Sequence, residues 1–239
     1  MNRRLTMMKR ILLAPVLALL LVSCGFERPD ESAPVERDKV SVPGAGVDRA
    51  NLELRMGAGE IKIRGGAQDL VDGTLEYRGK DAKPKVTNSN VGSHVSVTIE
   101  QPEGARHHSG HDVWDLSLSP KPLLDLTLNC GAGHSDLRLG DLSLRSLEVH
   151  SGVGQVEVDL RGQPKRDYDV TINGGVGQAK VYLPHDVGVY AEAHGGIGSI
   201  DVTGLEKRGD HYENSAYGKA PVTVRLQVHG GIGQIYLID

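Results

Sequence analysis

Between Gly57 and Gly233 of this 239-residue chain, a glycine motif of the form Gly-x-Gly occurs six times, and an alternating apolar strand pattern follows each copy. Four successive copies, from Gly131 to Gly196, start 21, 23 and 21 residues apart. A nearly constant interval of this size indicates a fold of stacked, similar units. We expect each motif to form a corner, where a positive φ angle or a close backbone approach excludes a side chain. The predicted corner glycines are Gly57, Gly59, Gly131, Gly133, Gly152, Gly154, Gly175, Gly177, Gly196, Gly198, Gly231 and Gly233.

Apolar and polar residues alternate with a period of two between these motifs, as in LDLTL at 124–128 and VTVRLQV at 222–228. This period predicts β-strands with one aliphatic face. Aromatic residues make up only 4% of the chain, so a narrow interior of stacked aliphatic side chains fits better than a broad core. We therefore predict an all-β chain with a single β-solenoid over residues 40–239. An eight-stranded barrel or sandwich is the alternative, because regular strand spacing is also typical of those folds.

The N-terminus has the features of an export signal. Four basic residues precede a twelve-residue apolar run at 11–22, which is shorter than the roughly 20 residues of a membrane-spanning helix. The run ends at Leu21-Val22-Ser23-Cys24, which resembles the box of bacterial lipoproteins, where the cysteine is lipidated and becomes the mature N-terminus. We predict a helical signal peptide at 1–23, lipidation of Cys24 and a flexible tether at 24–39. The alternative is an ordinary secretory signal with a chance cysteine.

The net charge and the predicted lipid anchor limit the classes of partner that this chain can bind. Removal of residues 1–23 would change the formal charge from −4 to −8, which argues against nucleic acid, because phosphate binding relies on clustered Lys and Arg. The expected partners are the membrane, through acyl chains on Cys24, and an envelope protein or glycan. The oligomeric state stays open. We expect the protein in the bacterial cell envelope, facing the periplasm or the exterior. If the cell is Gram-negative, Gly25 in place of an aspartate resembles the usual sorting pattern of outer-membrane lipoproteins and favours that membrane.

Two polar stretches, at 104–112 and 205–221, interrupt the repeats, and projecting loops of a solenoid commonly carry binding sites. The first contains His107, His108 and His111, whose imidazoles are weak candidates for a transition-metal site. We favour a solvated loop, because the residues between these histidines disfavour a helix. No cofactor is predicted.

A polar residue stands two positions before the first glycine of every motif. These residues are Arg55, Asn129, His150, Asn173, His194 and His229. In a solenoid equivalent positions stack, so His150, Asn173 and His194 should form a column that could meet a metal. Hydrogen bonding to the backbone of the corners is the favoured interpretation. A second column is expected from Gln155, Gln178 and Gln234, and Cys130 is expected to be a buried residue rather than a nucleophile.

The ordered series of motifs resembles the toast-rack family of bacterial envelope proteins, which is akin to the extracytoplasmic domain of LiaF-type antibiotic-response proteins and to the putative-adhesin β-solenoids. The segments NLELRMGAGEI at 51–61, WDLSL at 114–118 and LDLTLNCGAG at 124–133 carry the resemblance, which covers roughly residues 40–239. It implies a β-solenoid exposed to the envelope without an established enzymatic activity. One departure is that the antibiotic-response relatives hang from transmembrane helices, whereas this chain has a predicted lipid anchor.

The motifs do not match loops of known chemistry. Gly152-Val153-Gly154 continues into a strand without the third glycine and the helix of a dinucleotide site. No nucleophile elbow of the Gly-x-Ser-x-Gly type occurs either. We predict no catalytic residues and a non-enzymatic, lipid-anchored scaffold that binds an envelope component or protein partner in adhesion, envelope maintenance or stress response. The alternatives are a polysaccharide-acting β-helix enzyme and a periplasmic metal-binding protein.

Overall fold

The computed structural model describes residues 34–102 and 112–239, which are almost entirely β-strand and loop. Its elements are β1 Val35–Val42, β2 Arg49–Gly65, β3 Val71–Arg78, the 3-10 turn η1 Lys80–Ala82, β4 Lys85–Val91, β5 His94–Glu100, β6 Val113–Leu118, β7 Leu123–Arg138, β8 Leu144–Asp159, β9 Tyr168–Tyr182, β10 Gly188–Thr203, β11 Glu206–Arg208, β12 His211–Glu213 and β13 Thr223–Ile238. No helix in these two ranges is long and apolar enough to cross a membrane.

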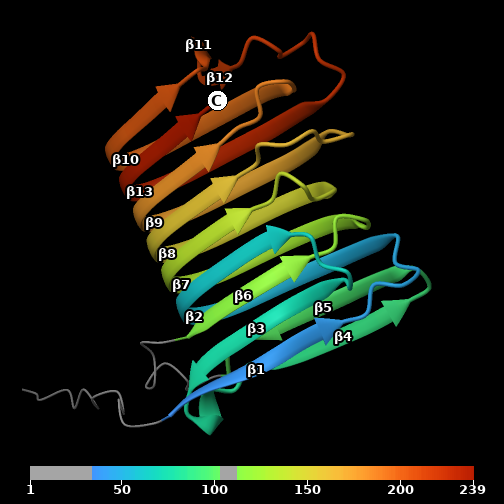
Figure 1. The fold of residues 1–239 in the computed structure, drawn as a ribbon. Coiled ribbons are helices and arrows are strands. Elements are labelled where there is room, and N and C mark those ends of the chain that lie inside the picture. Colours follow the sequence, from blue (N-terminus) through green and yellow to red (C-terminus); the bar gives the residue numbers. More distant parts are fainter. Residues whose placement is uncertain (1–33, 103–111) are drawn as a thin grey trace, which may run out of the picture.

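Six long strands, β2, β7, β8, β9, β13 and β10, stack in parallel and form the body of the molecule (Figure 1). Each folds over at its glycine motif, so that its two halves lie in two facing layers. In β7 the buried leucines are Leu124, Leu126 and Leu128 before the motif and Leu137 after it. The inward positions thus change from even to odd numbers across the corner, and both halves face one aliphatic core. The predicted all-β solenoid is confirmed, and the barrel or sandwich is wrong.

The corner geometry explains why the motif needs glycine, as Gly154 illustrates. Its φ angle is +141°, a conformation that side chains disfavour. A Cβ atom there would lie 1.9 Å from the carbonyl oxygen of Gly133 in the preceding coil. The coils can therefore keep their parallel spacing at the corner only where no side chain is present.

The N-terminal end of the stack is built differently, because two separate strands replace one folded strand. The first half of β2 pairs with β5 and its second half with β6, both in parallel. Three antiparallel strands then cover this end: β4 on β5, β3 on β6 and β1 on β3. Because β1 begins at Val35, the last five residues of the predicted tether 24–39 belong to the sheet.

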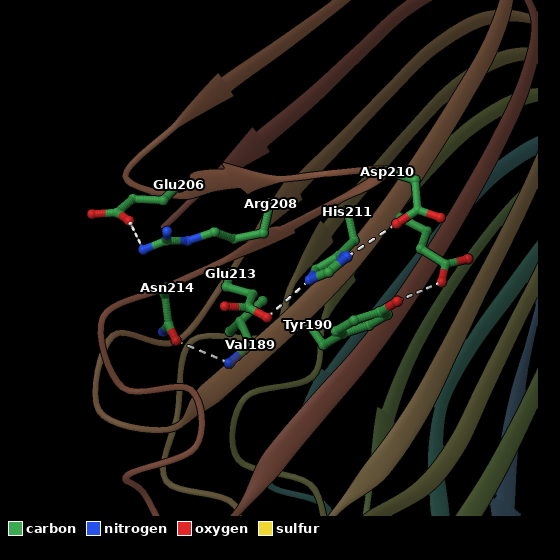
Figure 2. Close-up of polar contacts among 9 residues, drawn as sticks. Val189, Tyr190, Glu206, Arg208, Asp210, His211, Glu213 and Asn214 are labelled. Carbon is green, nitrogen blue, oxygen red and sulfur yellow. Dashed lines mark hydrogen bonds and ion pairs between the residues drawn. The ribbon is translucent and has the colours of Figure 1, made fainter.

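The C-terminal end departs from sequence order, because β13 lies between β9 and β10. The interval before β13 is not an irregular coil. It contains the hairpin β11–β12, in which β12 pairs with the outer edge of β10 at Tyr190 and Ala191. Asn214 then holds the returning chain. Its Oδ1 accepts a hydrogen bond from the Val189 amide at 3.0 Å (Figure 2), and its Nδ2 donates to the Val187 carbonyl at 2.9 Å.

Candidate functional site

A groove of about 860 Å³ runs along the outside of the corners, across β2, β7, β8 and β9. Its floor is the backbone at the first glycines of the motifs, Gly57, Gly131, Gly152 and Gly175, which leave it without side chains. One wall carries the polar residues that precede these glycines, among them Asn129. The groove is thus a product of the repeated pattern of a polar residue, a second residue that is small in all but the first coil, and a glycine.

The polar wall is a continuous column, but its order differs from the predicted one. The register places Arg55 beside Asn129, Asn129 beside His150, His150 beside Asn173, Asn173 beside His229 and His229 beside His194. The predicted neighbours Asn173 and His194 are therefore separated by His229, because β13 occupies the slot between their strands. The His194 and His229 rings stack with their centroids 5.4 Å apart.

Charges in this column are compensated on the protein itself. Arg55 donates two hydrogen bonds to the carboxylate of Glu53, at 2.7 and 2.9 Å, and Glu100 lies 3.7 Å away. The hydrogen bond to Glu53 raises the pKa of Arg55. His150 Nε2 lies 2.8 Å from Glu148 Oε1, and its Nδ1 lies 3.5 Å from Asn173 Nδ2. The wall therefore offers amide and imidazole groups for hydrogen bonding with little net charge.

Gln101 closes the groove at β2, and sequence reasoning missed it. Its Oε1 accepts hydrogen bonds from the amides of Gly57 at 2.7 Å and Ala58 at 3.3 Å, while its Nε2 donates to Asp112 Oδ2. The Asp112 carbonyl in turn accepts from the Glu60 amide at 2.8 Å. These groups supply, at the first corner, the partners that a further coil would otherwise provide. A single glutamine outside the repeats gave no pattern that could have identified it.

A second, smaller hollow of about 110 Å³ lies inside the corners of β8, β9, β13 and β10. Its cause is the residue just before each first glycine, which is Ser151 in β8 but glycine in the next three strands. Ile235 fills the space over Gly230, with its Cδ1 3.2 Å from the position of an added Cβ, whereas a Cβ on Gly174 would meet no side chain within 4 Å. Ala179 holds the position in β9 that Ile235 holds in β13, and its small side chain leaves the space over Gly174 unfilled.

The remaining candidate site residues from the sequence lie partly within and partly outside the ranges that the structure describes. Cys24, His107, His108 and His111 lie outside the described residues. Within 34–102 and 112–239 no group of three His, Cys, Asp or Glu side chains is arranged to hold a metal ion. Cys130 is buried, as expected, and burial raises the pKa of its thiol. In the glutamine column, Gln178 Nε2 donates to Gln234 Oε1 at 3.4 Å.

Comparisons with known proteins match this architecture. Residues 31–182 match the family model of the N-terminal domain of toast_rack, and residues 133–237 match that of the C-terminal region of the cell wall-active antibiotics response protein LiaF. A crystal structure of a putative cell adhesion protein from Clostridium sporogenes is similar at 29% identity and a TM-score of 0.81, covering 85% of this chain and 99% of that one.

A putative adhesin from Bacteroides fragilis is a more distant neighbour, at 10% identity and a TM-score of 0.31, over 88% of this chain and 99% of that one. No curated protein matched the sequence. The first family model covers well over half of the chain, and the strand series and corner glycines that it spans are those described above. The chain belongs to the toast-rack family.

Proposed function

We propose that this chain is a non-enzymatic, lipid-anchored protein of the bacterial cell envelope whose corner groove docks an envelope partner. The observation that carries the proposal is the continuous groove of about 860 Å³ across four coils. Its floor of bare backbone allows close approach, and its wall presents hydrogen-bonding groups at the strand spacing of about 4.8 Å. Such a surface suits a partner that lies along the stack and contacts successive coils.

The family supports the location and the absence of catalysis. The two matching family models and the Clostridium structure concern toast-rack, antibiotic-response and adhesion proteins, and none of these descriptions names an enzymatic activity. Many carboxylates of the described coils pair with basic residues on the outer faces, as Asp136 does with Arg138 and Asp159 with Arg161. Such exposed pairs fit a solvated surface better than a catalytic cleft.

The anchor can be tested by fractionation. Acyl chains on Cys24 would hold the chain on membranes, so Cys24→Ser should move it to the soluble envelope fraction with an unchanged circular dichroism spectrum. Cys130→Ser, at a buried thiol outside the predicted signal sequence, is the matched control and should stay with the membranes. Retention of Cys24→Ser in the membrane fraction would contradict the lipid anchor.

The docking site can be tested by photo-cross-linking in intact cells. A photoreactive amino acid at Asn129 in the groove wall should give discrete cross-linked products. The same amino acid at Glu157, which lies on the other half of its strand and does not line the groove, should give far less product. Equal yields from the two positions would contradict a docking role for the groove.

A further inference from the structure

A ridge of apolar side chains runs beside the groove and continues past its end along the corners of β13 and β10. It consists of the middle residues of the Gly-x-Gly motifs, which the register stacks in the order Ala58, Ala132, Val153, Val176, Ile232 and Ile197. The last four are 55%, 46%, 51% and 71% exposed. Four of the seven large apolar side chains that are exposed among the described residues thus stand in one row.

The surface around this ridge is unusually poor in charge. From β7 to β10 the corner segments 129–134, 150–155, 173–178, 229–234 and 194–199 contain no Asp, Glu, Lys or Arg, although these make up 24% of the chain. Depletion of charge around apolar residues is typical of the centre of protein interfaces. The predicted mature chain carries a net charge of −8, so this strip is where two copies can meet without opposing like charges.

We propose that two copies of this chain form a dimer about a two-fold axis that is parallel to the stack. In this dimer the ridge of each copy lies in the groove of the other copy. The proposal rests on the proposed function and names the partner for the same groove. Ridge and groove are neighbouring columns at each corner, so one surface contains both halves of a self-complementary contact. Where ridge and groove overlap, at β8 and β9, the bare glycines Gly152 and Gly175 of the floor leave room for Val153 and Val176 of the second copy.

The charges support this arrangement. A two-fold rotation about an axis parallel to the stack keeps equivalent coils of the two copies at the same level. It reverses the order of the columns across each corner. The wall column of one copy, from Arg55 to His194, therefore faces the column of the other copy that follows the motifs. That second column consists of Glu60, His134, Gln155, Gln178, Gln234 and Ser199. Arg55 faces Glu60 of the second copy, and every other pair joins amide, imidazole or hydroxyl groups that can hydrogen-bond.

The size of the contact predicts a weak and reversible dimer. Six coils at about 4.8 Å spacing and six residues at about 3.3 Å each give about 570 Å² on each copy. The total is at the lower limit for a specific interface. Because the axis is parallel to the stack, both N-terminal ends point the same way. Two copies can then be anchored to one membrane, where confinement raises their effective concentration.

Cysteine cross-linking between two tagged copies of the full chain in cells tests the proposal. One copy carries Asn173→Cys and the other Gln178→Cys, which the two-fold arrangement brings face to face. Mild oxidation should yield a disulfide-linked heterodimer. Asn173→Cys with Glu157→Cys, on the outer face of the other layer, is the control and should give at least several-fold less product. Equal, low yields from both pairs would overturn the dimer.

Charge exchange provides an independent measurement in the same assay. Glu60→Arg in both copies places two arginines opposite each other and should lower the heterodimer yield several-fold. Adding Arg55→Glu should restore it, because the opposite charges then face each other again. If photo-cross-linking from Asn129 captures another envelope component while the cysteine pair gives no heterodimer, the docking function stands and the dimer fails. Absence of any product in both assays would contradict both.

Discussion

Replacement of Gly154 by alanine should destabilise the stack strongly, because two separate costs add. The φ angle of +141° is unfavourable for any side chain, which costs of order 1–3 kcal/mol. The new Cβ would also lie 1.9 Å from the Gly133 carbonyl oxygen. Relief requires β7 and β8 to separate by about 1 Å at the corner, which weakens the nearest ladder hydrogen bonds at about 1 kcal/mol each. We expect a total loss of about 3–5 kcal/mol.

The control is Gly92→Ala, which adds a side chain at another glycine of positive φ angle but without a close contact. Gly92 also has a positive φ angle, +63°, but an added Cβ would meet no atom within 4 Å. We expect this variant to lose only about 1 kcal/mol. The measurement is the free energy of unfolding from urea titration of both variants and the parent. A loss for Gly154→Ala no larger than that for Gly92→Ala would refute the role of close coil contact at the corner.

Three further changes probe other parts of the molecule. Ala179→Ile should fill the hollow of about 110 Å³ as Ile235 does in the next coil, and raise the unfolding free energy by about 1–2 kcal/mol; a lower value in urea titration would show that no usable space exists. Gln101→Ala leaves corner amides of β2 without their acceptor, so it should cost about 1–3 kcal/mol, whereas an unchanged melting temperature would contradict this. His211 stacks on Tyr190 with ring centroids 4.4 Å apart, and the hydrogen bond to Glu213, followed by that to Asp210, raises its pKa (Figure 2). Its stabilisation of the hairpin β11–β12 should be complete below its ordinary pKa of about 6.5 and lost as pH rises through the raised value. The measurement is amide hydrogen exchange in the hairpin over this pH range, compared with that of His211→Gln. If exchange in the parent does not speed up relative to the variant, protonation of His211 does not stabilise the hairpin.

Most of the architecture follows from the sequence because the repeat determines both local structure and stacking. Alternation in segments such as 124–128 sets the inward face, and a conformation that only glycine adopts easily sets the corner at residues such as Gly154. The column positions were therefore predictable from motif spacing alone. The stacking order of the strands was not predictable from the motif spacing. The position of β13 between β9 and β10 depends on the path of the chain through the 35-residue interval from Gly196 to Gly231. The motifs carry no information on that path.

The candidate site was only partly predictable for a related reason. The polar wall was visible as a repeated position, but the groove depends on the shape of the bare glycine floor beside it. Gln101 closes the groove through hydrogen bonds between residues 43 and 44 positions apart in the chain. Likewise, the hollow at β9 depends on Gly174 before the corner and the small Ala179 after it. Such pairings become visible only when both halves of the coil are in place.

The central claim is that the corner groove is occupied by a partner in the cell. It can be measured as the rate at which a small maleimide labels Asn129→Cys, in intact cells and in the purified protein diluted to a monomer. Glu157→Cys, away from the groove, corrects for access of the reagent. We predict that labelling at Asn129→Cys is several-fold slower in cells than in the purified protein, relative to this control. An equal ratio in both settings would contradict the account.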